Sequence, residues 1–123
     1  MNQKYEITDI VHPQYPWLHR IRALRDVRED VHAGDLGGFV QSEENLSQEG
    51  QCWVANNAVA AEESYISGDA IMWDYSCARG CAVISGKSRI GGEAIIEDHA
   101  IVTSGYVPVS YTHLRAHETS LHL

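Results

Sequence analysis

The chain has 123 residues, 44% of them hydrophobic, and 17 acidic against 9 basic side chains give it a formal charge of −8. This length is typical of one compact domain, and the dispersed acidity argues against a long nucleic acid as partner, because that binding needs clustered Lys and Arg. No stretch has the roughly 18 consecutive apolar residues of a membrane-spanning helix, and the first residues lack the pattern of a signal peptide. Three cysteines without a framework spacing are typical of reduced thiols. We therefore expect a cytoplasmic protein that binds no membrane.

The N-terminal part of the chain predicts a β-hairpin. Residues 4–25 contain two extended runs around a proline-containing turn at residues 12–16. We expect residues 1–30 to form a hairpin that caps the domain that follows. Val40 and Leu46 lie six positions apart, which predicts that irregular coils begin in this region and that a two-residue offset near Cys52 and Trp53 resets the register.

Residues 53–106 fall into nine consecutive sextets. The second position is apolar in every sextet, the sixth is Ala or Ser in eight of nine, and the fourth and fifth are rich in Gly, Asn and Asp. Those last residues tolerate turns and positive φ. A period of six fits neither a helix nor a long alternating strand. It predicts short strands joined by sharp corners, with one large and one small side chain pointing inward in each unit.

The sextets resemble the hexapeptide repeat of left-handed parallel β-helices, in which an aliphatic residue is followed four places later by a small one. Ile66 with Ala70 and Ile84 with Ser88 follow this rule. The resemblance implies an all-β fold for residues 31–107, with three sextets in each triangular coil and coils stacked about 4.8 Å apart. The N-terminal hairpin would cover the first open edge, which is otherwise a template for aggregation.

A second resemblance covers residues 4–107. The stretch "RALRDVREDVHAGDLGGFVQSEENLSQEGQCWV" is similar to the opening of a group of β-helical proteins found in phages and prophages and among bacterial proteins assigned as transferases. It implies a phage-type protein in the cytoplasm of a bacterial host. Members of the group mostly have no established activity, so this resemblance predicts the fold and not the function.

One functional hypothesis is acyl transfer. Many hexapeptide-repeat β-helices are acetyl-CoA or acyl-CoA dependent transferases that use a histidine as general base. The resemblance therefore implies acetyl-CoA as cofactor and His99, the only histidine in the sextets, as the base, tuned by Asp98 or Glu97. We favour a solvated corner residue for His99, because the regular coils leave no loop to build an acceptor pocket.

The second hypothesis is binding without catalysis, and it rests first on the outward position of the sextets. That position is apolar or aromatic in eight of nine units, which predicts a self-association interface. The β-helix family commonly forms trimers, so we expect a homo-oligomer that is a trimer or a multiple of one. The outward residues are Trp53, Val59, Tyr65, Ile71, Cys77, Val83, Arg89, Ile95 and Ile101.

A ligand site is predicted where subunits meet. Four aromatic side chains could stack on a planar group and three cations could neutralise a phosphate, although the same residue types also pack interfaces. We expect no catalytic residue, metal or cofactor under this hypothesis. The predicted ligand-binding residues are Trp53, Tyr65, Trp73, Tyr75, Arg79, Lys87 and Arg89.

The hypothesis that we favour is a non-enzymatic phage counter-defence protein. Such a protein, called a sponge, would sequester a nucleotide-derived signal molecule between its subunits. An acetyltransferase is the first alternative. The second is an inhibitor that binds a host protein.

The last segment of the chain differs from all that precedes it. His113, His117 and His122 lie close together in the sequence, a grouping that could form a metal or catalytic site. However, "VSYTHLRAHET" resembles, in frame, the translation of a transposase adapter used to prepare sequencing libraries. The resemblance implies that residues 109–123 are a non-native tail, that the gene is metagenomic, and that these histidines have no evolved chemistry.

Overall fold

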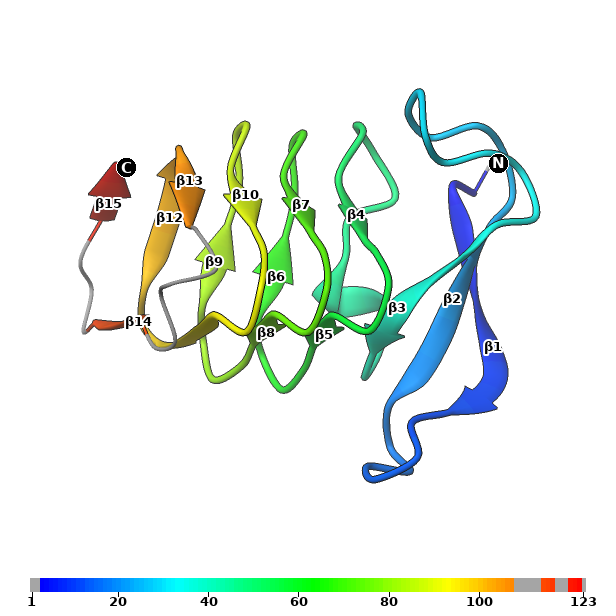
Figure 1. Ribbon diagram of the computed structural model, residues 1–123, viewed down its shortest axis with the longest axis horizontal. Coiled ribbons are helices and arrows are strands. Elements are labelled where there is room, and N and C mark those ends of the chain that lie inside the picture. Colours follow the sequence, from blue (N-terminus) through cyan, green and yellow to red (C-terminus); the bar gives the residue numbers. More distant parts are fainter. Residues whose placement is uncertain (1–2, 108–113, 117–119, 123) are drawn as a thin grey trace.

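The computed structural model describes residues 3–107, 114–116 and 120–122, and in it the chain winds through three sheets in turn (Figure 1). One sheet consists of β4 (Trp53–Val54), β7 (Ile71–Met72), β10 (Arg89–Ile90) and β13 (Tyr106–Val107). The next consists of β6 (Tyr65–Ile66), β9 (Val83–Ile84), β12 (Ile101–Ser104) and β15 (Ser120–His122). The third contains β5 (Val59–Ala60), β8 (Cys77–Ala78), β11 (Ile95–Asp98) and β14 (Leu114–Ala116). This confirms the predicted all-β fold, a left-handed parallel β-helix with an N-terminal hairpin.

The second and sixth positions of the sextets form the core. Because residues three sextets apart are strand partners, as Val54 and Met72 are, each inward side chain stacks on its equivalent in the next coil. The residues at the second position are all fully buried: Val54, Ala60, Ile66, Met72, Ala78, Ile84, Ile90, Ile96 and Val102. The small residues beside the corners are also buried: Ala58, Ser64, Ala70, Ser76, Ala82, Ser88, Ala94 and Ala100.

In eight of the nine sextets, the corner is made by a residue in the left-handed backbone region at the fourth position. The buried corner serines remain satisfied, because the hydroxyls of Ser64, Ser76 and Ser88 donate to the carbonyl oxygen three residues earlier at 2.8, 2.8 and 2.6 Å. Glycine is needed at position 86 for a second reason, since a Cβ there would overlap the carbonyl oxygen of Thr103. Values of φ between 56° and 67° occur at Asn56, Glu62, Gly68, Asp74, Gly80, Gly86, Gly92 and Asp98.

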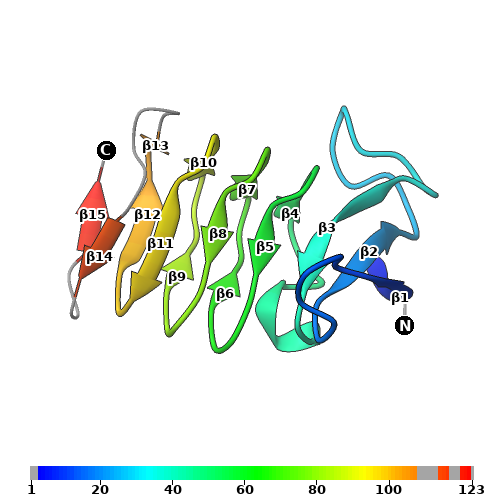
Figure 2. The same cartoon turned by 60° about the horizontal axis from the view of Figure 1, so that its bottom comes forward.

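The N-terminal strands extend the β5–β8–β11 sheet beyond its first coil (Figure 2). β1 and β2 form the predicted hairpin, with Ile7 opposite Ile21, and β2 is antiparallel to β3. The direction changes at β3, which lies parallel to β5 with Phe39 opposite Val59. The hairpin therefore covers the first edge of this sheet. The strands span Tyr5–Val11 (β1), His19–Ala23 (β2) and Leu36–Val40 (β3).

Arg20 fastens the hairpin to the first coil. Its guanidinium donates to the carbonyl oxygens of Gly37 at 2.7 Å and Asn56 at 2.8 Å. It also donates to Asn57 Oδ1 at 2.8 Å and lies 4.3 Å from the centroid of the Phe39 ring. One side chain thus joins β2, β3 and the first corner of the helix.

A short 3-10 helix, η1 (Glu43–Asn45), leads from β3 into the coils. Asn45 is fully buried and its amide is fully used. Its Nδ2 donates to the carbonyl oxygens of Glu62 and Ser64, while its Oδ1 accepts from the backbone N–H of Gln41 and Ser42. The side-chain amide of Asn45 therefore joins the chain just before η1 to the corner that lies between β5 and β6.

Most of the adapter-like tail, including residues 113 and 117 of the histidine cluster, lies outside the described residues. Its two described pieces, β14 and β15, pair in parallel with β11 and β12. The described part of the chain has no helix long and apolar enough to cross a membrane.

Replacing Asn45 by Asp should destabilise the fold by about 2 to 4 kcal/mol, because a buried carboxylate cannot donate to the two carbonyl oxygens that the amide serves. Urea unfolding at neutral pH measures the change. Asn56→Asp is the matched control, since Asn56 is exposed and Asp is tolerated at positive φ; we expect less than about 0.5 kcal/mol there. Equal effects of the two substitutions would contradict the role of Asn45.

Candidate functional site

A groove of about 570 Å³ lies between the N-terminal loop of residues 28–36 and the β4–β7–β10 sheet. The loop supplies one wall and the outward residues of the sheet supply the floor. The charged lining residues are Arg28, Asp30, Asp35 and Arg89. The others are Val31, Leu36, Trp53, Ala55, Asn56, Ile71 and Trp73.

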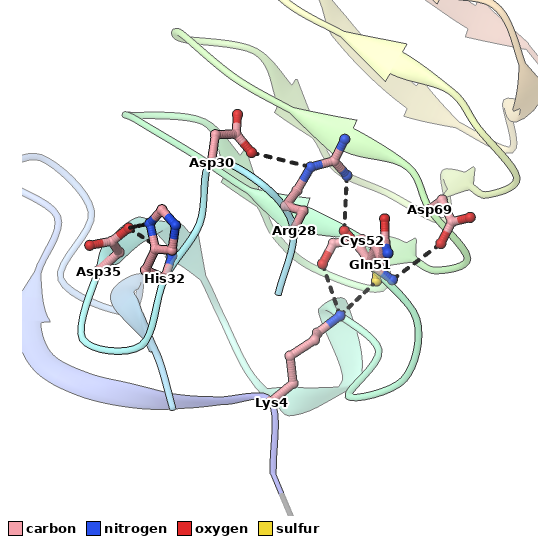
Figure 3. A network of polar contacts seen from close by, with 8 residues as sticks. All are labelled: Lys4, Arg28, Asp30, His32, Asp35, Gln51, Cys52 and Asp69. Carbon is pink, nitrogen blue, oxygen red and sulfur yellow. Dashed lines mark hydrogen bonds and ion pairs between the residues drawn. The ribbon is translucent and has the colours of Figure 1, made fainter. Parts of the chain in front are cut away.

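Backbone and side-chain hydrogen bonds fix the loop wall. The Ala33 N–H donates to Asp26 Oδ1 at 3.0 Å and the His32 N–H donates to Asp35 Oδ2 at 2.9 Å. Val27 and Val31 are buried beneath it, 7% and 6% exposed. Figure 3 shows Asp30, His32 and Asp35 on this loop. The loop wall of the groove is therefore a hydrogen-bonded turn that is anchored by two buried valines.

The floor is formed by Trp53, Ile71 and Arg89, which are aligned across β4, β7 and β10. Two of the outward residues are already buried within the chain, because Trp53 is 1% and Ile71 is 8% exposed. The Tyr5 and Trp53 rings pack in a T-shaped arrangement, with 6.4 Å between their centroids. Trp53 therefore belongs to the core, whereas Arg89 at the other side of the floor is exposed.

Trp73 forms a side of the groove, and its position depends on a glycine in the next coil. A Cβ at Gly91 would overlap the Trp73 indole. Gly91 lies three sextets after Trp73, so the two occupy equivalent positions in adjacent coils. The indole thus lies against the backbone of the next coil, half-buried, with part of its surface open to the groove.

The two groove arginines differ in how they are held. Arg28 Nε lies 3.5 Å from Asp30 Oδ1 and its Nη1 donates to the Gln51 carbonyl oxygen at 3.0 Å (Figure 3). Only 14% of the Arg28 side chain is exposed. Arg89 is exposed, and within the described part of the chain its guanidinium has no hydrogen bond or ion pair. Arg89 is therefore the groove cation open to an anionic ligand.

The structure gathers Trp53, Trp73 and Arg89 from the predicted site in one groove. The remaining aromatic candidates lie elsewhere. Tyr65 is on the β6–β9–β12 sheet and 41% exposed, and Tyr75 follows Trp73 at the corner and is 66% exposed.

The other two predicted cations also lie outside the groove lining. Arg79 follows β8, where its Nε donates to Glu97 Oε1 at 2.7 Å, and the carboxylate raises the pKa of this guanidinium. Lys87 is exposed at the corner between β9 and β10. The two therefore carry no charge into the groove.

Sequence reasoning missed the loop wall, above all Arg28, Asp30 and Asp35. Nothing in the sextets points to them, because they precede the repeat and reach the sheet through the turn of the N-terminal loop. The one signal for Arg28 and Asp30 in the sequence is the density of charge in "RDVRED".

His99, the candidate base of the alternative hypothesis, is exposed at the corner between β11 and β12. That corner joins the two sheets other than the β4–β7–β10 sheet. Within one chain, the structure therefore does not bring His99 to the groove.

The two partly exposed thiols are poorly suited to nucleophilic chemistry. Burial raises the pKa of the Cys77 thiol. The Cys81 thiol donates to Glu63 Oε2 at 3.4 Å, and this hydrogen bond raises its pKa. A raised pKa leaves less thiolate, the reactive form. Among the described residues, no group of three His, Cys, Asp or Glu side chains is placed to hold a metal ion.

No protein-family model matches the chain. Over 80 residues, 64% of its length, the chain is 36% identical to a protein of Escherichia coli (strain K12) named as the uncharacterized acetyltransferase YdcK. The match covers 19% of that protein, so the chain spans about a fifth of its relative. The β-helix and this likeness together fit a protein of the hexapeptide-repeat transferase type.

Replacing Gly91 by Ala should displace the Trp73 indole and destabilise the fold by about 1 to 3 kcal/mol, the usual cost of overpacking. Urea unfolding followed by tryptophan fluorescence measures both effects. In the Trp73→Ala background the same substitution should cost much less, because the overlapping ring is gone. An equal cost in both backgrounds would contradict the contact.

Proposed function

We propose that the chain is a β-helical binding module whose groove holds a small molecule with an anionic group and a planar ring, as a nucleotide has. The observation that carries this proposal is the exposed guanidinium of Arg89, which has no partner among the described residues, together with the half-buried indole of Trp73 in one groove. The groove volume, about 570 Å³, lies within the range of about 300 to 1,000 Å³ that is usual for small-molecule sites.

The chemistry of the lining supports a nucleotide in particular. A guanidinium binds phosphate oxygens in a bidentate manner. The Trp73 indole and the half-exposed Leu36 offer apolar surface to a base. The Asp35 carboxylate, 50% exposed, can accept from the hydroxyl groups of a ribose. The phosphate, the base and the ribose of a nucleotide would each contact a group of matching chemistry in the groove.

The likeness to a protein named as an acetyltransferase supports one specific ligand. Coenzyme A carries an adenine nucleotide with a diphosphate, so acetyl-CoA satisfies the same groove chemistry as a free nucleotide. A phage counter-defence sponge would instead sequester a nucleotide-derived signal there. We favour binding without catalysis, because the groove and His99 lie apart in the chain.

Acetyl transfer is the second candidate, and the likeness to the named acetyltransferase favours it. In this case His99 would have to reach a groove on another copy of the chain. The expected homo-oligomer would supply such a copy, and the acetyltransferase candidate requires an assembly in which His99 of one subunit lies beside Arg89 of the next.

Isothermal titration with ADP, coenzyme A and cyclic dinucleotides should detect binding of at least one of them. Arg89→Gln should weaken that binding by about tenfold or more, since a charge-assisted hydrogen bond contributes roughly 1.5 to 3 kcal/mol. Lys87→Gln is the matched control, because it removes the same charge two residues away and outside the groove lining; its affinity should stay unchanged. The proposal is wrong if none of the probes binds or if both variants bind equally weakly.

Incubation with acetyl-CoA and a panel of amines and alcohols, followed by a thiol reagent, should release no coenzyme A above the blank. Release that is lost in His99→Ala would instead establish the acetyltransferase candidate. Light scattering on the same sample measures the number of chains, and a monomer would remove both the expected homo-oligomer and the route by which His99 could act on a groove.

A further inference from the structure

The first β-strand is anchored by a lysine that meets a cysteine inside the protein. Lys4 and Cys52 are both fully buried, and Lys4 Nζ lies 3.1 Å from Cys52 Sγ (Figure 3). Nζ also donates to the carbonyl oxygens of Cys52 at 2.8 Å and Glu49 at 3.2 Å. The two carbonyl oxygens take two of the three ammonium donors, so the third points at the sulfur.

The Cys52 sulfur is also surrounded by backbone carbonyl oxygens. Cys52 Sγ lies 3.6 Å from the carbonyl oxygens of Ser47 and Glu49 and 3.7 Å from that of Ile66. A nitrogen nucleophile and an oxidisable sulfur are thus kept in contact, away from solvent. Burial lowers the pKa of the Lys4 ammonium, although the neighbouring Cys52 opposes this shift. The lower pKa increases the share of neutral amine, which is the form that can attack sulfur.

We propose that Lys4 and Cys52 are a modification site, at which a peroxide joins Nζ to Sγ in a sulfenamide. The Cys52 sulfur attacks hydrogen peroxide, breaks the O–O bond and becomes a sulfenic acid, while one water leaves. The neutral Lys4 amine then attacks that sulfur; an N–S bond forms, the S–O bond breaks, and the hydroxyl leaves with an amine proton as a second water. The sulfur is oxidised by two electrons and the peroxide is reduced. Sulfenic acids condense with nitrogen in this way elsewhere in proteins.

The crosslink would act on the groove as well as on the cap. It ties the residue before β1 to the residue before β4, and so the hairpin to the first coil. The Gln51 carbonyl oxygen, one residue from the crosslinked sulfur, is the acceptor that holds Arg28 at the groove. Oxidation would fix this wall and reduction would release it.

The other two cysteines provide internal controls. Within the described part of the chain, no lysine donates to the Cys77 or Cys81 sulfur, and Cys81 faces the Glu63 carboxylate instead. These thiols can gain oxygen from a peroxide but have no amine with which to condense. Replacing both by Ser leaves Cys52 as the single thiol of the full chain.

The test uses this Cys77→Ser, Cys81→Ser protein, treated with hydrogen peroxide in the folded state and weighed by mass spectrometry. The expected product is lighter than the starting protein by two hydrogens and regains them with dithiothreitol. Its tryptic map should lack cleavage after Lys4 and contain the N-terminal peptide joined to the Cys52 peptide. The midpoint of thermal unfolding should rise on oxidation and fall again on reduction.

Lys4→Arg in the same background keeps the charge and hydrogen-bond donors but has no nucleophilic amine, so it should gain oxygen atoms and form no crosslink. If the unvaried Lys4 protein keeps its thiol, or gains oxygen while trypsin still cleaves after Lys4, the proposal is overturned. The peptide map of that protein decides the matter without the variant, should Lys4→Arg fail to fold.

Discussion

The whole β-helix depends on one constraint, that every strand finds its hydrogen-bonding partner three sextets further along the chain. The backbone N–H of Trp53 donates to the Ala70 carbonyl oxygen and that of Ile71 to the Ser88 carbonyl oxygen, both at 3.0 Å. Since the coils are in register, each position of the sextet meets its own equivalent above and below. A single inserted residue would turn inward side chains outward. For this reason the inward apolar residue, the residue with left-handed backbone and the small residue recur in the same order along the coils.

The same constraint creates the problem that the N-terminal segment solves. A stack of coils leaves open strand edges at its ends. One of these edges, on the β5–β8–β11 sheet, is covered by β3, which pairs in parallel with β5, and then by the antiparallel strands β2 and β1. Arg20 and Lys4 anchor this cap through backbone carbonyl oxygens of the coils. The loop between β2 and β3 then passes beside the β4–β7–β10 sheet. The groove is the space between this irregular loop and the regular surface of the sheet.

The sequence therefore predicts the periodic part of the structure well. Ile66, Ile84 and Val102 had to point inward because the period allows nothing else, and they do. It predicts the groove poorly, since Arg28 and Asp35 obey no repeat and their place depends on how one loop folds back. The same limit explains Trp53: its outward position follows from the period, but its burial follows from Tyr5, which the period does not include. Contacts between the periodic and the non-periodic parts, such as that of Lys4 with Cys52, follow from no sequence pattern and are seen only in the structure.

The arrangement of three sheets also decides how a function can be built on this chain. Position in the sextet and coil fixes the side on which a residue lies, so the floor of the groove belongs to the β4–β7–β10 sheet and His99 to the opposite corner. No small movement of side chains can join them, because the stacked coils lie between. Under the proposal, binding would require the groove alone, whereas acetyl transfer with His99 as base would require a second chain turned so that its corner faces the first. A catalytic role would thus be a property of the assembly, and a binding role can be a property of each chain.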